Sequence, residues 1–374
     1  ILTSLPPVST LPSYADWLPE AGAHEDEIGS TVMVRVIIRQ KGSTATDPVS
    51  NARAKFKCRL NDVTREPGLC LNSPPRESAV ASPDLLFHAA ENLLPFDGGL
   101  AAESVRDDLN QINLAIDSFD YGAYGTLDVT AEIQGGGSVK AFVEGQPDQF
   151  FLRLPQDDNQ NRIADAWEKQ EQVYGWNLAP DWDKDSTPSG QRSDGDGLSV
   201  YEEYRGFVVK GVHQRLDPRW KDLFVYDPDG LVLFTLTAGP EVIDLYEASG
   251  VFPHLIQDDE WTGSGTSGEQ RRIVNFNTSG LGHVVDQHGL EVRLERGWMS
   301  TDFGSGSFGK VYDNEFLGNP PSGGQWGDPL NAQPATTFFE SEAADRPRDA
   351  EYTLVRPEAI KQNIWNEVRY HTKA

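Results

Sequence analysis

Long apolar runs, basic clusters and common enzyme signatures are all missing from this sequence of 374 residues. No run of about 18 apolar residues occurs, so we predict no membrane-spanning helix. Lys and Arg form no patch, and the formal net charge is −26. A chain this acidic repels phosphate backbones, so we expect no binding to nucleic acid. The zinc signatures H-E-x-x-H and H-x-x-E-H and the nucleophile motif G-x-S-x-G are also missing.

Cysteine is scarce, with only Cys58 and Cys70, in "KCRLNDVTREPGLCLN". Two cysteines cannot form a zinc site by themselves, and no His lies between them. We expect a disulfide that closes this loop, which fits an exported protein. The alternative is two reduced cysteines in a core. The first residue is Ile1 rather than Met, as in a processed chain that has lost a signal peptide, although a trimmed chain would look the same.

The residues that are present can fill real cores. Hydrophobic residues make up 38% of the chain and Trp occurs nine times, so disorder is not expected. The length suits two or three domains.

The sequence pattern predicts a multidomain, β-rich protein in four parts. Residues 1–28 are rich in Pro, Ser and acids and predict an extended arm. Short alternating segments in 29–154 predict an immunoglobulin-like antiparallel β-sandwich. Residues 104–119 have a helical period inside that region. Residues 155–209 predict an acidic segment of loops and short helices, and 210–374 predict a mixed α/β domain.

The acidic segment carries oxygen-bearing side chains at a fixed phase. The window "DDNQNRIADAWE" has such side chains at its first, third, fifth, ninth and twelfth places, and a backbone carbonyl falls at the seventh. A hard cation needs six to eight converging oxygens, and a short loop provides them at this spacing. The predicted calcium ligands of this first loop are Asp157, Asn159, Asn161, Ile163, Asp165 and Glu168. The alternative is a capped, solvated turn.

A second loop has the same phase in "SDGDGLSVYEEY". Asp194, Asp196, the Leu198 carbonyl and Glu203 match the third, fifth, seventh and twelfth places, but Arg192 falls at the first and cannot bind a cation. Upstream lies "DWDKDSTPSGQ", which we interpret as an insertion. The residues that could fold back as the first ligand are Asp181, Asp183 and Asp185. Carboxylates and carbonyls without thiolates or imidazoles favour Ca²⁺, with one ion per loop.

Both loops resemble the calcium loops of thrombospondin type 3 repeats and of dockerin-like, EF-hand-like modules in exported bacterial and archaeal proteins. The resemblance implies a secreted, calcium-binding protein. Arg162 departs from the pattern, because such loops usually carry Gly at the sixth place, where the backbone needs an unusual turn.

A weaker resemblance covers the following residues. "RWKDLFVYDPDG" (219–230), a predicted amphipathic helix at 239–252 and a predicted strand at 271–277 follow the order of a zincin-like domain. The zinc helix that defines zincins has no counterpart, so the resemblance implies at most a scaffold without its catalytic site.

Two classes of function fit these patterns. The first is a secreted or cell-surface structural or adhesive protein, in which calcium rigidifies the junction between domains and which contacts copies of itself or other surface proteins. The alternative is an extracellular hydrolase with structural calcium, or a carbohydrate-binding module. A hydrolase predicts titratable groups that converge in a pocket, nearest to His283, Asp286, His288 and Glu291.

Overall fold

A computed structural model gives the fold. It describes residues 2–4, 13–40, 48–74, 82–185, 195–228, 230, 251–262, 272–294, 309–312, 333–334 and 352–355. The chain divides into two units, each described by itself below. Unit 1 comprises Ile1–Trp182, Val200–Gly206 and Asn277–His283, and unit 2 comprises Asp183–Ser199, Phe207–Phe276 and Val284–Ala374.

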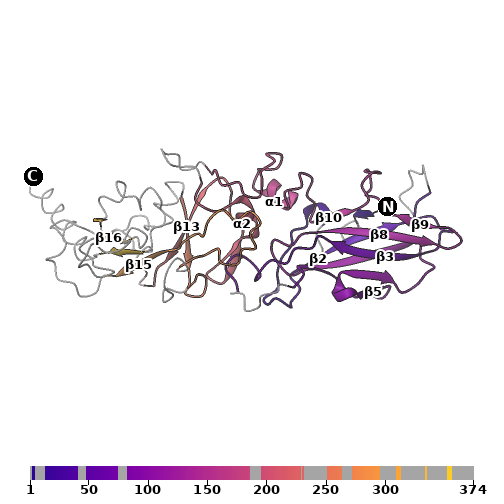
Figure 1. The fold of residues 1–374 in the computed structure, drawn as a ribbon, viewed down its shortest axis with the longest axis horizontal. Coiled ribbons are helices and arrows are strands. Elements are labelled where there is room, and N and C mark those ends of the chain that lie inside the picture. The colour runs from indigo at the N-terminus through magenta and orange to yellow at the C-terminus, as the bar shows by residue number, and fades with distance from the viewer. Residues whose placement is uncertain are drawn as a thin grey trace, which may run out of the picture. The chain divides into compact units, whose positions relative to one another are not determined.

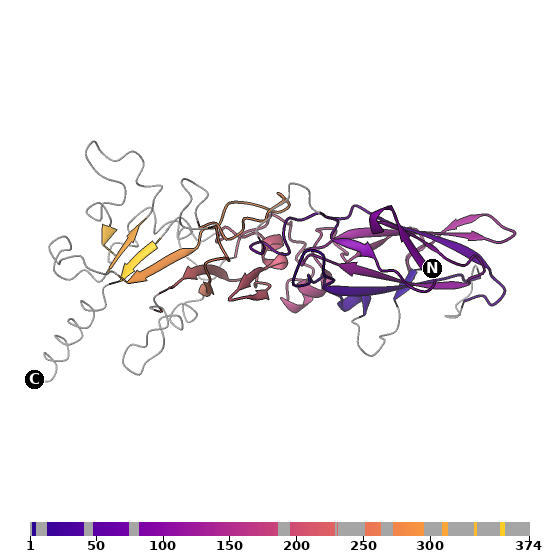
Figure 2. The same cartoon turned by 90° about the horizontal axis from the view of Figure 1, so that it is seen from below.

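Unit 1 is built on two antiparallel sheets (Figure 1). The first has the strand order β1-β2-β7-β4, with bounds Leu2–Ser4, Ser30–Ile37, Gln111–Ser118 and Leu85–Phe87. The second has the order β10-β8-β3-β6-β5, with bounds Leu152–Leu154, Gly125–Ile133, Ala54–Asn61, Ala101–Ser104 and Leu93–Phe96. Strand β9 (Ser138–Lys140) pairs with β8. Figure 2 shows the long strands of these sheets lying side by side.

The two sheets share one hydrophobic core, because their long strands alternate between buried and exposed residues. Phe56 and Leu60 of β3 lie in the same buried cluster as Val32 and Val34 of β2. Each such side chain stabilises the fold by roughly 1.5–3 kcal/mol through burial. Trp17, from the N-terminal stretch, is 1% exposed in this core. The β-rich class expected from the sequence is therefore confirmed.

The expected disulfide is wrong. Cys58 and Cys70 are not joined, and both are buried thiols. Cys58 lies on β3 among the core side chains, paired in register with Val129 of β8. Cys70 lies in a turn, where its thiol is 3.6 Å from the Asn72 Oδ1 that accepts its hydrogen bond. The cysteines thus occupy two separate packing environments rather than the two ends of a covalent link.

The expected helix over 104–119 is also wrong, because Gln111–Ser118 forms strand β7. All eight residues of β7 pair with β2. Ile112, Leu114 and Ile116, at alternate positions of the strand, are buried. The two-residue period of a strand therefore prevails over the helical period of this segment when it pairs in the sheet.

Two six-residue helices complete unit 1, α1 (Asp165–Gln170) and α2 (Val200–Arg205). They share a second buried cluster, in which the ring centroids of Trp167 and Tyr204 are 5.4 Å apart. Ile163, two residues before α1, is fully buried in the same cluster. Short 3-10 turns lie at η1 (Tyr14–Asp16) and η2 (Asp97–Gly99).

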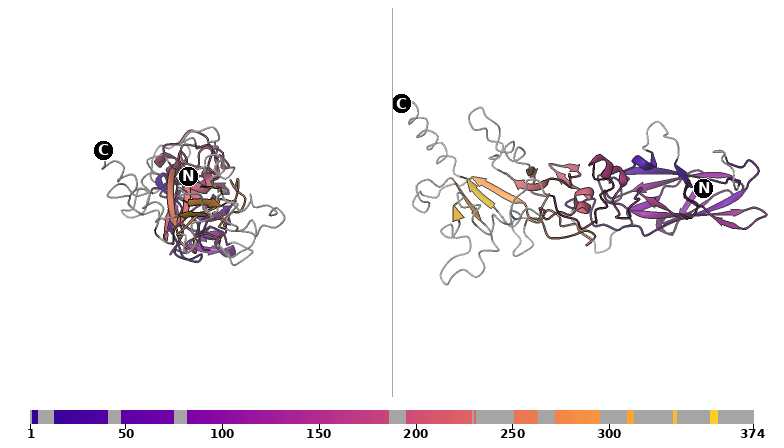
Figure 3. Two further views of the ribbon diagram at one scale, coloured as in Figure 1. Left: turned by 90° about the vertical axis from the view of Figure 1, so that its left-hand side faces the viewer. Right: turned by 90° about the horizontal axis from the view of Figure 1, so that it is seen from above.

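Unit 2 contains a six-stranded mixed sheet of order β14-β13-β15-β18-β16-β17. The bounds are Val251–Ile256, Lys221–Tyr226, Leu290–Leu294, Tyr352–Val355, Gly309–Tyr312 and Gln333–Pro334. Strand β13 pairs in parallel with β14 and β15, and β15 pairs in parallel with β18. Figure 3 shows the orange β15 beside the yellow β18. A separate hairpin joins β11 (Phe207–Val209) to β12 (Val212–Gln214).

Other expectations for unit 2 have mixed outcomes. The predicted helix at 239–252 lies outside the described residues, except that Val251 and Phe252 begin β14. The predicted strand at 271–277 is wrong for its described residues, which contain only an isolated bridge from Ile273 to His288. Among the described residues, no helix is long and apolar enough to cross a membrane.

Candidate calcium sites

The first loop wraps around the carboxylate of Asp157. Its Oδ1 accepts hydrogen bonds from the backbone N–H groups of Gln160 (2.7 Å) and Asn161 (3.1 Å), and its Oδ2 accepts one from Arg162 (3.1 Å). Gln160 and Arg162 both have a φ of 66°, which is the left-handed region. Arg162 therefore adopts the turn for which the sixth place usually holds Gly, and its guanidinium lies 5.5 Å from the centre of the Tyr124 ring.

The other predicted ligands of the first loop converge on Glu168. The side-chain amides of Asn159 and Asn161 both donate to Glu168 Oε1, at 3.1 Å and 2.9 Å. Asp165 Oδ1 accepts the backbone N–H of Asp158 at 3.1 Å. The third, fifth and twelfth places of the predicted loop thus meet in space, and α1 fixes the ninth and twelfth.

Two carboxylate oxygens of this loop are buried without a hydrogen-bond partner among the described residues, Asp165 Oδ2 and Glu168 Oε2. Asp165 is 0% exposed and Glu168 is 1% exposed. Burial raises the pKa of both carboxyls above the ordinary values. Buried carboxylate oxygens without donors are costly, and a bound cation is one of the few groups that compensates them.

In the second loop, Asp183 has the same role as Asp157. Its Oδ1 accepts the backbone N–H of Asp196 (3.0 Å) and its Oδ2 accepts that of Gly197 (3.1 Å). Asp196 and Gly197 hold the fifth and sixth places, as Asn161 and Arg162 do in the first loop. Among the three residues left open by the sequence, the geometry thus places Asp183 first, while Asp181 is exposed.

Three carboxylates of unit 2 form a group that could hold an ion. Oxygens of Asp183, Asp185 and Asp196 all lie within 4.8 Å of one another. Asp185 is 2% exposed, and neither of its carboxylate oxygens has a hydrogen-bond partner among the described residues. Burial raises the pKa of Asp185 to about 7; nearby Lys221 opposes this shift and Asp183 adds to it. For Asp196, burial and then the charges of Asp185 and Asp222 raise the pKa well above its usual range.

The remaining predicted ligands have different outcomes. Leu198 is fully buried, and its backbone N–H donates to Asp196 Oδ1 at 2.8 Å. Glu203 is a buried residue of α2, belongs to unit 1 and is not part of the three-carboxylate group. Asp194 lies outside the described residues.

The residues considered for a hydrolase lie in both units. His283, in unit 1, has its Nδ1 3.0 Å from Glu202 Oε1. In unit 2, Asp286 is exposed, His288 bridges to Ile273, and Glu291 belongs to β15.

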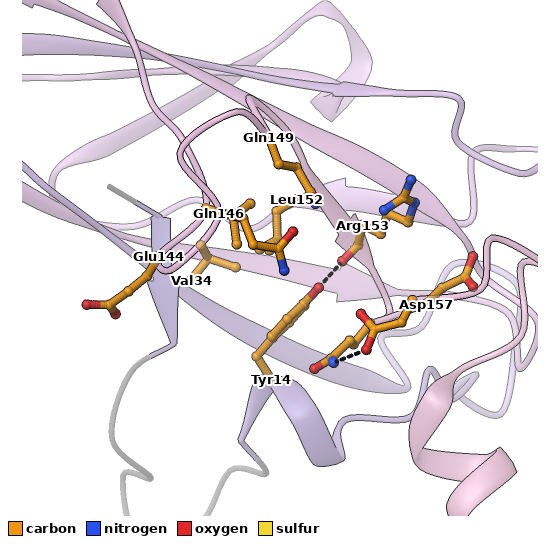
Figure 4. A pocket seen from close by; sticks show the side chains of 11 residues that line it. Tyr14, Val34, Glu144, Gln146, Gln149, Leu152, Arg153 and Asp157 are labelled. Carbon is orange, nitrogen blue, oxygen red and sulfur yellow. Dashed lines mark hydrogen bonds between the residues drawn. The ribbon is translucent and has the colours of Figure 1, made fainter. Parts of the chain in front are cut away.

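A small polar pocket in unit 1 was not predicted. It has a volume of about 280 Å³, and none of the four hydrolase candidates lines it. The Tyr14 hydroxyl donates to the Arg153 carbonyl at 2.7 Å, and the Gln146 side chain lies across from it (Figure 4). Gln149 and Gln156 add two further amides. Most of the lining comes from residues 143–158, and Tyr14 joins it only through the fold, so the sequence could not have indicated the complete pocket.

No protein-family model, curated protein or solved structure matches this chain.

Proposed function

We propose that this chain is a secreted structural or adhesive protein that binds two calcium ions, one in each acidic loop. One observation carries the proposal: both loops bury carboxylate oxygens that have no hydrogen-bond donor among the described residues. An unpaired buried charge costs several kcal/mol, so a folded protein either protonates such groups or binds a cation between them.

The ligand types favour calcium over other metals. In both loops the candidate ligands are carboxylates, amides and backbone carbonyls, with neither imidazole nor thiolate among them. Zinc and copper prefer nitrogen and sulfur ligands. Magnesium usually keeps several waters and takes few protein ligands, whereas calcium accepts six to eight oxygens in a flexible shell.

Calcium would lower the repulsion within a chain of net charge −26. Along the sequence, both loops lie between the strands of the sandwich and β13 of the mixed sheet. We therefore propose that calcium orders the segment that joins the sandwich to the mixed sheet in the sequence. Contacts with copies of the chain or with other surface proteins follow from that order. Extracellular calcium modules typically bind with Kd values of about 10⁻⁴–10⁻³ M, and we place these sites in that class.

The finer fold assignments are also proposals. Two antiparallel sheets around one core support an immunoglobulin-like sandwich for residues 29–154. Parallel pairing of β13, β14, β15 and β18 supports a mixed α/β domain for residues 210–374. The shared pattern of Asp157 and Asp183 supports the likeness to thrombospondin type 3 and dockerin-like loops.

The direct test is isothermal titration calorimetry with calcium on the whole chain and four variants. We expect two sites in the wild type, and one each in Glu168→Gln and Asp185→Asn. Asp158→Asn and Asp181→Asn are matched controls, because both remove an exposed acid beside a loop, and both should keep two sites. Binding that is undetectable at 5 mM calcium, or that all four variants change equally, would refute the proposal.

A second candidate function rests on the polar pocket. Three glutamine amides, a tyrosine, an arginine and three carboxylates line about 280 Å³. These groups suit a small ligand with many hydroxyl groups, such as one sugar unit. Titration of a panel of monosaccharides, followed by amide NMR shifts, should move the resonances near Gln146 and Gln149 in the wild type and not in the Gln146→Ala variant. No shift with any sugar at 50 mM would remove this candidate.

A further inference from the structure

With Asp183 at the first place of the second loop, Asp185 takes the third place in the way that Asn159 does in the first loop. The second loop then differs from the first by an insertion between its third and fifth places. In the first loop, only Gln160 separates Asn159 from Asn161. In the second, residues 186–195 separate Asp185 from Asp196. The short chain link that fixes these two ligands relative to each other in the first loop is therefore missing from the second.

The start of strand β13 holds both ends of this insertion. The Lys221 ammonium donates to the Asp185 carbonyl at 3.1 Å and to the Gly195 carbonyl at 2.6 Å. The next residue, Asp222, donates its backbone N–H to Asp196 Oδ2 at 2.5 Å. The Asp222 carboxylate itself is engaged by His254, whose Nε2 is 2.5 Å from Asp222 Oδ1. All these residues belong to unit 2.

The loop is tightly fitted at this point. Gly195 has a φ of +78°, and a Cβ there would lie 1.9 Å from Asp183 Oδ1. Only glycine can therefore bring its carbonyl to Lys221 while Asp183 takes the first place of the loop.

The Lys221 hydrogen bonds to Asp185 and Gly195 go to backbone carbonyls, and the ammonium also forms an ion pair with the Asp185 carboxylate. Lys221 Nζ is 3.7 Å from Asp185 Oδ2, which is beyond hydrogen-bond distance. Both Asp185 oxygens are without a hydrogen-bond partner among the described residues, although a lysine side chain lies beside them.

We infer that Lys221 is a positioning residue for the second calcium site: it joins the two ends of the insertion and so places Asp185 and Asp196 for the same cation. This inference rests on the proposed function. Two ligands on separate segments lose affinity when their relative freedom increases, because binding must then order them. The competing account is an internal counter-ion, whose positive charge would repel calcium. The two accounts predict opposite effects of removing the lysine.

The test is calcium titration of Lys221→Met in the Glu168→Gln background, where only the second site remains. Positioning predicts that calcium affinity falls by about tenfold or more. Lys221→Arg keeps donors for both carbonyls and should recover part of the loss. Lys210→Met is the matched control, because it removes one exposed positive charge from the same unit and should leave the affinity within twofold.

The outcomes separate this inference from the proposed function. Tighter calcium binding in Lys221→Met, or unchanged binding, would overturn the positioning role. If Glu168→Gln alone binds no calcium, the proposed second site fails before Lys221 is tested. Far-ultraviolet circular dichroism and melting in chelator should match the parent variant. If the fold or melting temperature of Lys221→Met differs from that of the parent variant, calcium binding by Lys221→Arg distinguishes the two accounts. Positioning predicts that Lys221→Arg binds calcium more weakly than the parent variant, and a counter-ion role predicts equal binding.

Discussion

Arg205 provides the sharpest stability prediction, because its guanidinium is 0% exposed and fully engaged inside unit 1. It donates to both carboxylate oxygens of Asp120, at 3.0 Å and 2.7 Å. It also donates to the carbonyls of Asn277 (2.5 Å) and Pro67 (2.6 Å). The Arg205→Met substitution would leave the Asp120 carboxylate buried without its cation.

The expected cost is large. Removing one partner of a buried ion pair costs about 3–5 kcal/mol, because the other charge remains uncompensated. For a unit of this size, 1 kcal/mol corresponds to roughly 2–4 °C, so the melting temperature should fall by roughly 6–20 °C. Differential scanning calorimetry at pH 7 in fixed calcium measures this shift.

An exposed pair of the same type is the control. Arg106 makes two bonds to Asp108, at 2.8 Å and 2.7 Å, but its side chain is 59% exposed. Arg106→Met should lower the melting temperature far less than Arg205→Met does, since exposed pairs are screened by solvent. Equal shifts for the two variants would refute the argument that burial, and not geometry, sets the cost.

Three further predictions follow from single residues. Burial, and then the charge of Asp120, raises the pKa of Asp84 well above its usual range. Ionisation of Asp84 therefore disfavours the folded state, and the free energy of unfolding should fall as the pH rises above about 4. The Asp84→Asn substitution should flatten that fall in urea unfolding measured from pH 4 to 8. Burial raises the pKa of Cys58 to about 12, and Cys70 is 0% exposed. Neither thiol should therefore react with Ellman's reagent before unfolding, and rapid reaction of the native protein would contradict the packing described. Arg162→Gly should tighten calcium binding at the first loop by a few-fold, because glycine adopts a φ of 66° without strain. Weaker binding would show that the Arg162 contact with Tyr124 contributes more to the loop than the backbone strain costs.

The first loop was predictable because its ligands are local in sequence. The spacing of Asp157, Asn159, Asn161 and Glu168 sets a phase that a turn followed by a helix brings together, and the structure brings these four residues together. A local pattern needs only local geometry to be correct.

The second loop was predictable only in part, because an insertion separates its ligands. The spacing in the sequence does not show which of Asp181, Asp183 and Asp185 takes the first ligand place. That depends on which carboxylate reaches the backbone of Asp196 and Gly197. Lys221 was missed entirely, because its contacts depend on where β13 lies in the fold.

The errors in the sandwich have a similar cause. The spacing of Cys58 and Cys70 suits a disulfide, but the β3 register points Cys58 into the core. Residues 104–119 have a helical period, but pairing along the whole of β2 makes Gln111–Ser118 a strand. In both cases tertiary contacts prevail over a local signal.

The most direct test of the central claim is native mass spectrometry of the whole chain with added calcium, combined with melting in calcium and in chelator. We predict two bound calcium ions per chain and a higher melting temperature in calcium, because a ligand that binds only the folded state stabilises it by about 2.7 kcal/mol at a concentration of 100 Kd. A chain that binds no calcium and melts at the same temperature in chelator would contradict the account.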